Sequence, residues 1–203
     1  MSKRTAKETY PRAFHRGRIP IYLEHFLRAG RDVARVTQEL GIEWDTSGYQ
    51  PLVDWRPCPA YAQRRPPHDL FLVNYKVSFL TFSISIENQW LLELSQQQGK
   101  MFSVAMHPET AREKGLRDGQ RVVLETPEGL CSPEVPLRLT EAVHPQVVAV
   151  PAILGRWATG NPRSRHRGVH YNSLIRYDMD RLDTVSAALD ACVRVRVRPV
   201  DVS

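Results

Sequence analysis

Short apolar runs separated by turn residues dominate the chain from residue 68 onward. Three of these runs, at 70–75, 101–106 and 146–152, have the length and composition of buried strands. Near the C-terminus, valine and arginine alternate from Val193 to Arg198. Because side chains of a strand point alternately to its two faces, the valines should face a core and the arginines should point outward.

Helices and a hairpin are predicted between these strands. One helix should cover 89–97, after the capping residue Asn88, and another should cover 107–115, with Pro108 in its first turn. Residues 121–139 should form a β-hairpin with TPEG as its turn. Two prolines in its second strand predict that this strand is bulged or lies at a sheet edge.

Residues 68–203 should therefore contain about six strands and a few short helices. The strands are too short, and their connections too varied, for a doubly wound parallel sheet. The pattern favours a mainly β fold: a small closed barrel with helical insertions.

The segment before residue 68 has a different texture. Residues 1–18 form a basic tail, and apolar residues at helical spacing predict an amphipathic helix over 19–41. Five prolines and four large aromatic residues follow in 42–68. Repeated proline excludes a regular helix, so we expect an extended strap that is pinned to a surface by its aromatic side chains. The predicted parts are a tail (1–18), a lead-in helix and strap (19–67) and a barrel domain (68–203).

The amino-acid composition limits the classes of partner and the cellular locations that this chain can have. A net charge of +6 favours an anionic partner, such as a phosphate-bearing cofactor, an acidic protein or nucleic acid. Cys58, Cys131 and Cys192 form no CxxC pair, so the chain alone should hold neither a zinc knuckle nor an iron–sulfur cluster. Charges interrupt every apolar run, so we expect no membrane insertion and no secretory signal. The expected location is cytoplasmic, or exported together with a signal-bearing partner.

The residues alone identify no catalytic set, because GxSxG, P-loop and GxGxxG motifs are missing. The richest polar stretch, 154–178, carries five arginines and three glycines, which together can bind phosphate groups. A solvated surface loop explains the same composition. His166 and His170 could share a metal only in a helix, and Gly168 between them favours a loop. We therefore predict no catalytic residue and no metal ligand on this chain.

The run from His107 to Pro151 carries a more specific signature. It reads H-P-x-x-A-x-x-x-G-L-x-D-G, then a valine-rich strand, a glycine turn, a second strand and V-x-P-x-V-V-x-V-P. The agreeing positions are Pro108, Ala111, Gly115, Leu116, Asp118, Gly119, Gly129, His144, Pro145, Val147, Val148, Val150 and Pro151. This pattern resembles the C-terminal cofactor-binding domain of the dimethyl-sulfoxide-reductase family of molybdopterin oxidoreductases.

The resemblance extends over roughly residues 18–198. Residues 69–83 resemble the family's first barrel strand and its pterin-holding loop, and GVHYNSL at 168–174 resembles a later loop whose asparagine binds the cofactor. Residues 183–197 resemble the family's closing segment. The polysulfide- or thiosulfate-reductase-like and arsenate-reductase-like branch is the most similar.

The resemblance implies a double-psi β-barrel that closes over a bis(molybdopterin guanine dinucleotide) cofactor of molybdenum or tungsten. The cofactor contacts that it implies are Asn74, Tyr75, Lys76, Thr81, Ser83, Arg156, Trp157, Tyr171 and Asn172. It also implies a catalytic partner chain with the metal ligand and an iron–sulfur cluster, and an electron-transfer iron–sulfur subunit as a further candidate partner. The chain should not catalyse a reaction alone, and we expect no nucleic-acid partner.

Departures from the family pattern keep an alternative open. The cysteines for the iron–sulfur cluster and the segment with the metal ligand are not in this sequence. Leu80 stands where relatives often carry histidine, and Asp190 stands where lysine is common. The alternative is a double-psi barrel without cofactor that acts as a structural or interaction subunit of a redox complex.

Overall fold

The computed structural model describes residues 22–52, 54–62, 65–81, 84–158 and 160–200. The predicted basic tail and Ser83 lie outside the described residues, as does the start of the predicted helix at 19–21. The chain divides into two compact units, Met1–Arg56 with Asp183–Ala188 and Pro57–Leu182 with Leu189–Ser203.

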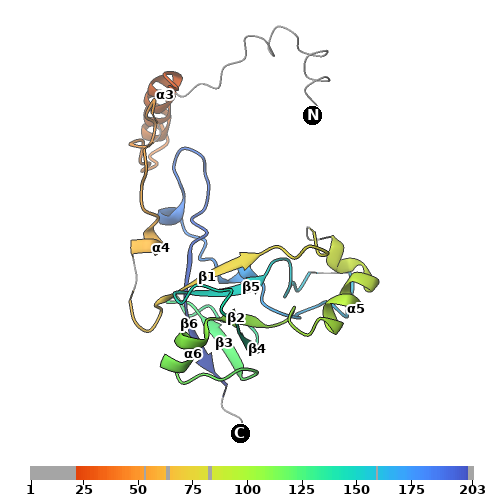
Figure 1. Cartoon of the computed structure of the whole chain (residues 1–203). Coiled ribbons are helices and arrows are strands. Elements are labelled where there is room, and N and C mark those ends of the chain that lie inside the picture. The colour runs from red at the N-terminus through yellow and green to blue at the C-terminus, as the bar shows by residue number, and fades with distance from the viewer. Residues whose placement is uncertain (1–21, 53, 63–64, 82–83, 159, 201–203) are drawn as a thin grey trace. The chain divides into compact units, whose positions relative to one another are not determined.

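Six strands among the described residues of the second unit form a closed barrel (Figure 1). They are β1 (Leu70–Tyr75), β2 (Val104–Met106), β3 (Arg121–Glu125), β4 (Val135–Leu139), β5 (Val147–Pro151) and β6 (Val193–Pro199). Around the barrel the order is β1-β5-β2-β4-β3-β6. The pairs β1–β5 and β2–β4 are parallel, and the remaining four pairs are antiparallel. The predicted mainly β fold with a closed barrel is confirmed.

Aliphatic side chains from every strand fill the barrel. Those that are at most 2% exposed include Leu72, Val104, Leu124, Leu137, Val148 and Val195. Val193 and Val197 are also buried in this core, which confirms the predicted inward face of the last strand. The period-two pattern therefore identified the core side of β6 correctly.

Two helices of the barrel unit begin and end at the signals in the sequence. Helix α5 (Gln89–Gln97) starts after Asn88, whose side-chain oxygen accepts from the Trp90 amide at 3.0 Å. Helix α6 (Pro108–Glu113) has proline in its first turn and is followed by Gly115 with a φ of 67°.

The arginines of β6 do not all point into solvent, as the alternation predicted. Arg194 is only 4% exposed and its guanidinium lies over the Phe71 ring at 3.4 Å. The short helix α4 (Pro59–Ala62) covers it, and Arg194 donates to the carbonyl oxygens of Ala60 at 3.1 Å and Tyr61 at 3.0 Å. Repeated proline therefore did not exclude this single helical turn, because Pro59 occupies its first position, where no amide donor is required.

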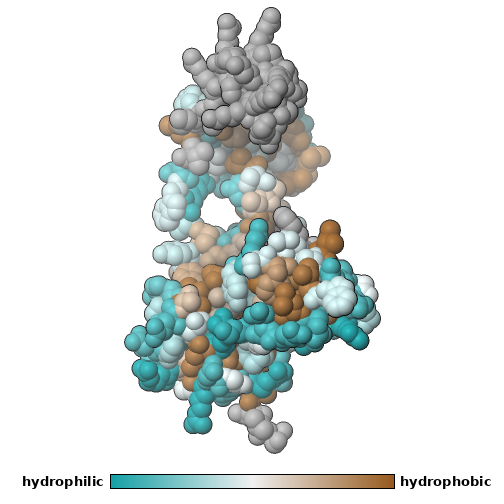
Figure 2. Space-filling view, turned by 45° about the vertical axis from the view of Figure 1, so that its right-hand side comes forward, coloured by the Kyte–Doolittle hydropathy of each residue, from teal (hydrophilic) through white to brown (hydrophobic). Residues whose placement is uncertain are grey.

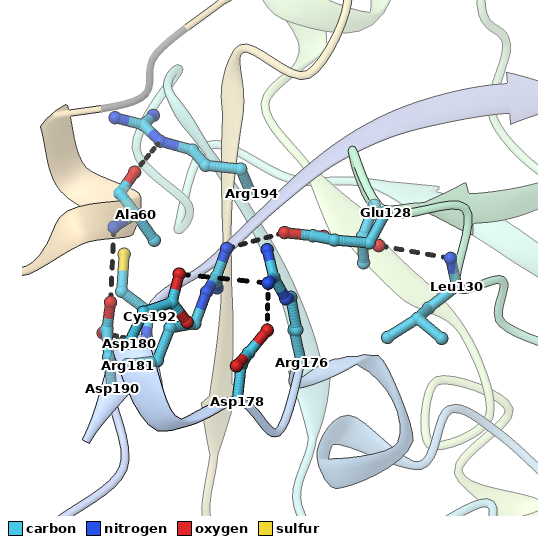
Figure 3. Close-up of polar contacts among 11 residues, drawn as sticks. Ala60, Glu128, Leu130, Arg176, Asp178, Asp180, Arg181, Asp190, Cys192 and Arg194 are labelled. Carbon is cyan, nitrogen blue, oxygen red and sulfur yellow. Dashed lines mark hydrogen bonds and ion pairs between the residues drawn. The ribbon is translucent and has the colours of Figure 1, made fainter. Parts of the chain in front are cut away.

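The predicted hairpin forms. Of the two alternatives predicted for its second strand, a bulge fits, because the register shifts by about one residue between the Val122–Val135 and Glu125–Cys131 pairs, and an edge position does not. Strand β4 pairs with β3 on one side and β2 on the other, because the barrel is closed. Its turn is also tied to a distant segment. Arg181, 8% exposed, donates to Glu128 in the turn at 2.6 Å (Figure 3).

The Glu128–Arg181 pair leads to the first expected result. Glu128→Ala removes the acceptor of a buried guanidinium and should lower the free energy of unfolding by about 1–3 kcal/mol. Chemical denaturation measures this change. Glu134→Ala in the same hairpin is the control, because its carboxylate is exposed and 3.9 Å from Arg121, and the expected change is within about 0.5 kcal/mol. Equal stabilities of the two variants would contradict a role for the buried pair.

The first unit contains helix α3 (His25–Glu39), which forms most of the predicted helix. Gly30 is its buried residue, and a β-carbon there would lie 2.7 Å from the Tyr49 β-carbon. Trp44 and Tyr49 both donate side-chain hydrogen bonds to the Thr184 carbonyl oxygen, at 3.2 Å and 3.3 Å. These two aromatic residues therefore anchor their segment, whereas Trp55 is 78% exposed.

The predicted domain boundary at 67/68 stays a prediction. Within the structure, Ala60 and Tyr61 contact the barrel, and residues 57–62 group with the second unit.

Candidate cofactor site at the ends of β1 and β5

The parallel pairing of β1 and β5 sends two loops out of the same end of the barrel. Tyr75, the last residue of β1, lies opposite Pro151, the last residue of β5. The carbonyl oxygen of Tyr75 then accepts a hydrogen bond from the Ala152 amide at 2.8 Å. The loops at 76–81 and 152–158 therefore begin side by side, as the ends of neighbouring parallel strands must.

A second apolar cluster packs these loops together. Its buried members are Leu80, Ile86, Leu92, Met101 and Leu154. Ile153 packs against it with a φ of 69°, a conformation that β-branched residues rarely adopt. Packing on this cluster holds the strained backbone, as is common where a loop supports a binding site.

A third segment, at 166–172, meets the loop after β5 at Gly155. The Gly155 φ is 72°, and a β-carbon there would collide with the His170 amide nitrogen and lie 2.6 Å from the Val169 carbonyl carbon. Two backbone hydrogen bonds join the segments, Gly155 to the Arg167 carbonyl oxygen at 2.6 Å and His166 to the Arg156 carbonyl oxygen at 3.1 Å. Only glycine permits this approach.

The predicted residues of β1 point in two directions. By strand alternation Asn74 shares the inward face of Leu70 and Leu72, but it is exposed, because it lies at the open end of the barrel. Tyr75 lies on the outer face instead, where it lines a groove of about 400 Å³ together with Arg138 and His144. Asn74 is therefore positioned to reach a ligand at the barrel mouth, whereas the Tyr75 side chain faces this separate groove.

The remaining predicted residues of these two loops are accessible. Lys76 and Thr81 are exposed in the loop after β1, and Trp157 is 68% exposed in the loop after β5. Arg156 beside Trp157 is half-buried.

Tyr171 and Asn172 lie together in the 3-10 helix η2 (Tyr171–Leu174), but they differ in role. The Tyr171 hydroxyl is 2.7 Å from the Ala191 carbonyl oxygen and 3.2 Å from the Leu72 carbonyl oxygen. Burial, together with nearby Cys192 and Asp190, raises the pKa of Tyr171 to about 12. The Tyr171 hydroxyl therefore forms hydrogen bonds within the barrel unit. The side chain of the next residue, Asn172, is exposed.

His170 is a residue that the sequence reasoning did not assign to the cofactor. Burial, and then the positive charge of Arg156, lowers the pKa of His170 below its ordinary value. Its Nδ1 atom is buried and has no hydrogen-bond partner in the part of the chain that the structure describes. Gly168 and the arginines around it are signals of a ligand-binding loop in the sequence. They do not show that His170 lies next to Gly155 and Arg156 in the fold.

The described residues contain no group of three histidine, cysteine or acidic side chains able to hold a metal ion. None of the described helices is long and apolar enough to span a membrane.

Comparison with protein families decides the assignment. The molydopterin dinucleotide binding domain family matches residues 71–192, more than half of the chain. The chain belongs to this family. The predicted relationship to molybdopterin proteins is thereby confirmed, and the closed six-strand barrel is consistent with a double-psi barrel. No curated protein matches the sequence.

A similar solved structure is acetylene hydratase from Pelobacter acetylenicus, with a TM-score of 0.56 and 17% sequence identity. The match covers 80% of this chain and 22% of that one, so the chain spans about a fifth of the length of the similar protein. At this identity, the likeness supports the fold alone.

The site residues fit a molybdopterin dinucleotide in the chemistry that they offer. Carboxamides such as those of Asn74 and Asn172 supply both donors and acceptors, which a pterin ring edge requires. Lys76 and Arg156 supply positive charge for the phosphates of a dinucleotide. The buried Nδ1 of His170 is a polar atom that such a ligand could pair.

Proposed function

We propose that this chain is the cofactor-capping part of a molybdenum or tungsten bis(molybdopterin guanine dinucleotide) oxidoreductase. Membership of the dinucleotide-binding family supports it, together with the convergence of three predicted segments at one end of the barrel. The cofactor, when bound, supplies the redox chemistry, and the protein supplies binding and orientation. Asn74 and Asn172 bind polar edges of the cofactor, and Arg156 and Lys76 attract its phosphates.

His170 and Tyr171 have supporting roles in this proposal. Tyr171 ties the segment that carries Asn172 to β1 and to Ala191 through its hydroxyl. Neutral His170 offers a donor or an acceptor at Nδ1 without adding charge next to Arg156. Thr81, Ser83, Tyr75 and Trp157 remain predicted contacts, and the polysulfide- or arsenate-reductase-like branch remains the proposed subgroup.

A partner chain completes the proposed site. It carries the metal ligand and an iron–sulfur cluster, and an electron-transfer subunit is a further candidate. Three large apolar side chains are exposed close in sequence to members of the second apolar cluster. Ile84 is 79% exposed, Trp90 is 85% exposed and Trp157 is 68% exposed. Figure 2 shows hydrophobic surface that interrupts the hydrophilic surface of the barrel unit. Exposed apolar groups of this kind support docking on another protein surface.

Replacement of Asn172 tests the proposed binding site. Asn172→Leu removes an exposed carboxamide from η2, next to the segment that meets Gly155, and leaves buried cofactor atoms unpaired, at about 1–3 kcal/mol per group. Cofactor affinity should fall roughly ten- to a hundredfold. The readouts are molybdenum or tungsten and released guanine nucleotide in the assembled complex, which should still form.

Gln146→Leu is the matched control for this experiment. It removes an exposed carboxamide just before β5, at the opposite end of the strand from the candidate site. Its cofactor content should equal that of the wild type. Equal, non-zero occupancy in the wild type and both variants would remove Asn172 from the site. Absence of metal and guanine nucleotide from all three would favour the alternative of a cofactor-free interaction subunit.

A further inference from the structure

Two cysteines that are far apart in the sequence meet on one side of the barrel. Cys58 precedes α4, where its carbonyl oxygen accepts from the Tyr61 amide at 3.0 Å, and Cys192 directly precedes β6. Their side chains lie close enough for Cys58 to act electrostatically on the Cys192 thiol. Both residues are half-buried, and both belong to the barrel unit.

One carboxylate positions the backbone on both sides of this thiol pair. Asp190 accepts from the Cys192 amide at 2.9 Å through one oxygen and from the Ala60 amide at 3.3 Å through the other. Figure 3 shows Ala60, Asp190 and Cys192 gathered next to Arg194, with the Cys192 sulfur toward the turn of Ala60. Asp190 therefore ties the residue before β6 to the turn at Ala60.

Arg194 and Phe71 hold the same turn from the barrel side. The guanidinium donates to the carbonyl oxygens of Ala60 and Tyr61, and the Tyr61 ring stacks on Phe71 with centroids 5.7 Å apart. Cys58 is two residues before Ala60, and Cys192 is two residues before Arg194, so both cysteines are adjacent to this hydrogen-bond network. Their thiols are therefore kept together by fixed backbone rather than by chance encounter of flexible side chains.

We propose that Cys58 and Cys192 are a redox-active thiol pair that forms a reversible disulfide and thereby fastens residues 57–62 to strand β6. The pair is not part of a three-ligand metal site among the described residues. Cys131 is exposed just after the hairpin turn, opposite Glu125, and takes no part in the pair.

The oxidant is a small-molecule disulfide such as oxidised glutathione. The Cys58 sulfur attacks one sulfur of that disulfide, and the other half leaves as a thiol with one proton. The Cys192 sulfur then attacks the Cys58 mixed disulfide, and the second half leaves as a thiol with the second proton. Two protein thiols lose two electrons and two protons in total, and one small disulfide is reduced to two thiols.

The environment of Cys192 agrees with this order of attack. Burial, and then the neighbouring Cys58 and Asp190, raise the pKa of Cys192 to about 12. Cys192 therefore keeps its proton at neutral pH, and the first attack falls to Cys58.

Thiol counting and peptide mapping on the full chain test the pair. After purification under reducing conditions, alkylation should label three cysteines. Treatment with oxidised glutathione should make Cys58 and Cys192 resistant to alkylation, whereas the exposed Cys131 should either be alkylated or carry one glutathione. The peptides containing Cys58 and Cys192 should be linked, and dithiothreitol should release them. Cys131→Ser is the matched control: its oxidised form should have no alkylatable thiol and the same link.

Single-site variants distinguish a disulfide-forming pair from two accessible thiols that react independently. In Cys58→Ser, the remaining Cys192 should react at least tenfold more slowly with oxidised glutathione than the wild-type pair. In Cys192→Ser, Cys58 should retain glutathione as a stable mixed disulfide. A link that includes Cys131, or stable glutathione on Cys58 in the wild type without the 58–192 link, would overturn the proposal. The Cys131→Ser mapping decides the matter even where a single-site variant does not fold.

Discussion

Gly155→Ala should have the largest effect on the barrel unit. The new β-carbon would collide with the His170 amide nitrogen and lie 2.6 Å from the Val169 carbonyl carbon. Because these are backbone atoms, no side-chain rotation can relieve the conflict, and residues 166–172 must move away from the loop after β5. We expect a loss of about 4 kcal/mol or more in the free energy of unfolding, at the upper end of single substitutions. Urea denaturation measures it.

Gly129→Ala isolates the steric part of this effect. Gly129 also has a positive φ, 82°, but nothing lies within 4 Å of a β-carbon there. It should lose only the about 1–2 kcal/mol that a left-handed backbone costs an alanine. The Gly155 variant should in addition lose cofactor, since Asn172 is carried by the displaced segment. Similar losses of stability in the two variants would contradict the close packing of 155 on 168–170.

Arg194→Ala should have the second largest effect. Its removal leaves the Ala60 and Tyr61 carbonyl oxygens without their donors and takes a cation from the face of Phe71. Ala60 is 2% exposed, so its unpaired acceptor costs about 1–3 kcal/mol, and loss of the part-buried Tyr61 hydrogen bond and of the ring contact adds to this cost. We therefore expect about 2–4 kcal/mol of destabilisation. Hydrogen exchange in residues 57–62 should rise at the same time.

Arg198→Ala in the same strand is the control for Arg194. Its guanidinium is 50% exposed and lies 3.5 Å from Glu125, which keeps a 2.6 Å contact with Arg196. The expected change is within about 0.5 kcal/mol. If both variants were equally stable, Arg194 would be an ordinary surface arginine, as the strand pattern alone suggested.

The contrast between these two arginines shows what could be predicted from the sequence. Alternation along 193–198 identified the core valines, and the residues Asn88, Pro108 and Gly115 marked helix ends, because these signals are local. Arg194 has the same local pattern as Arg198. Its burial depends on α4, which is more than a hundred residues earlier in the chain, and no spacing rule reports that contact.

For the candidate site, too, some features could be predicted from the sequence and others depend on contacts in the folded chain. The family resemblance supplied Asn74 and Asn172, and strand pairing then showed that β1 and the loop after β5 leave the barrel together. The direction of Tyr75 into the outer groove depends on where β1 ends, and the internal use of the Tyr171 hydroxyl depends on Ala191 and Leu72. The approach of His170 to Gly155 requires the folded loops and could not be read from residue types.

The metal and nucleotide content of the complex that this chain forms in its own cells tests cofactor binding most directly. The chain would be purified anaerobically with its bound partners, and molybdenum, tungsten and acid-released guanine nucleotide would be measured per chain. We predict one of the two metals together with guanine nucleotide in stoichiometric amounts. A folded, partner-bound complex that contains neither metal nor guanine nucleotide would contradict the proposed function.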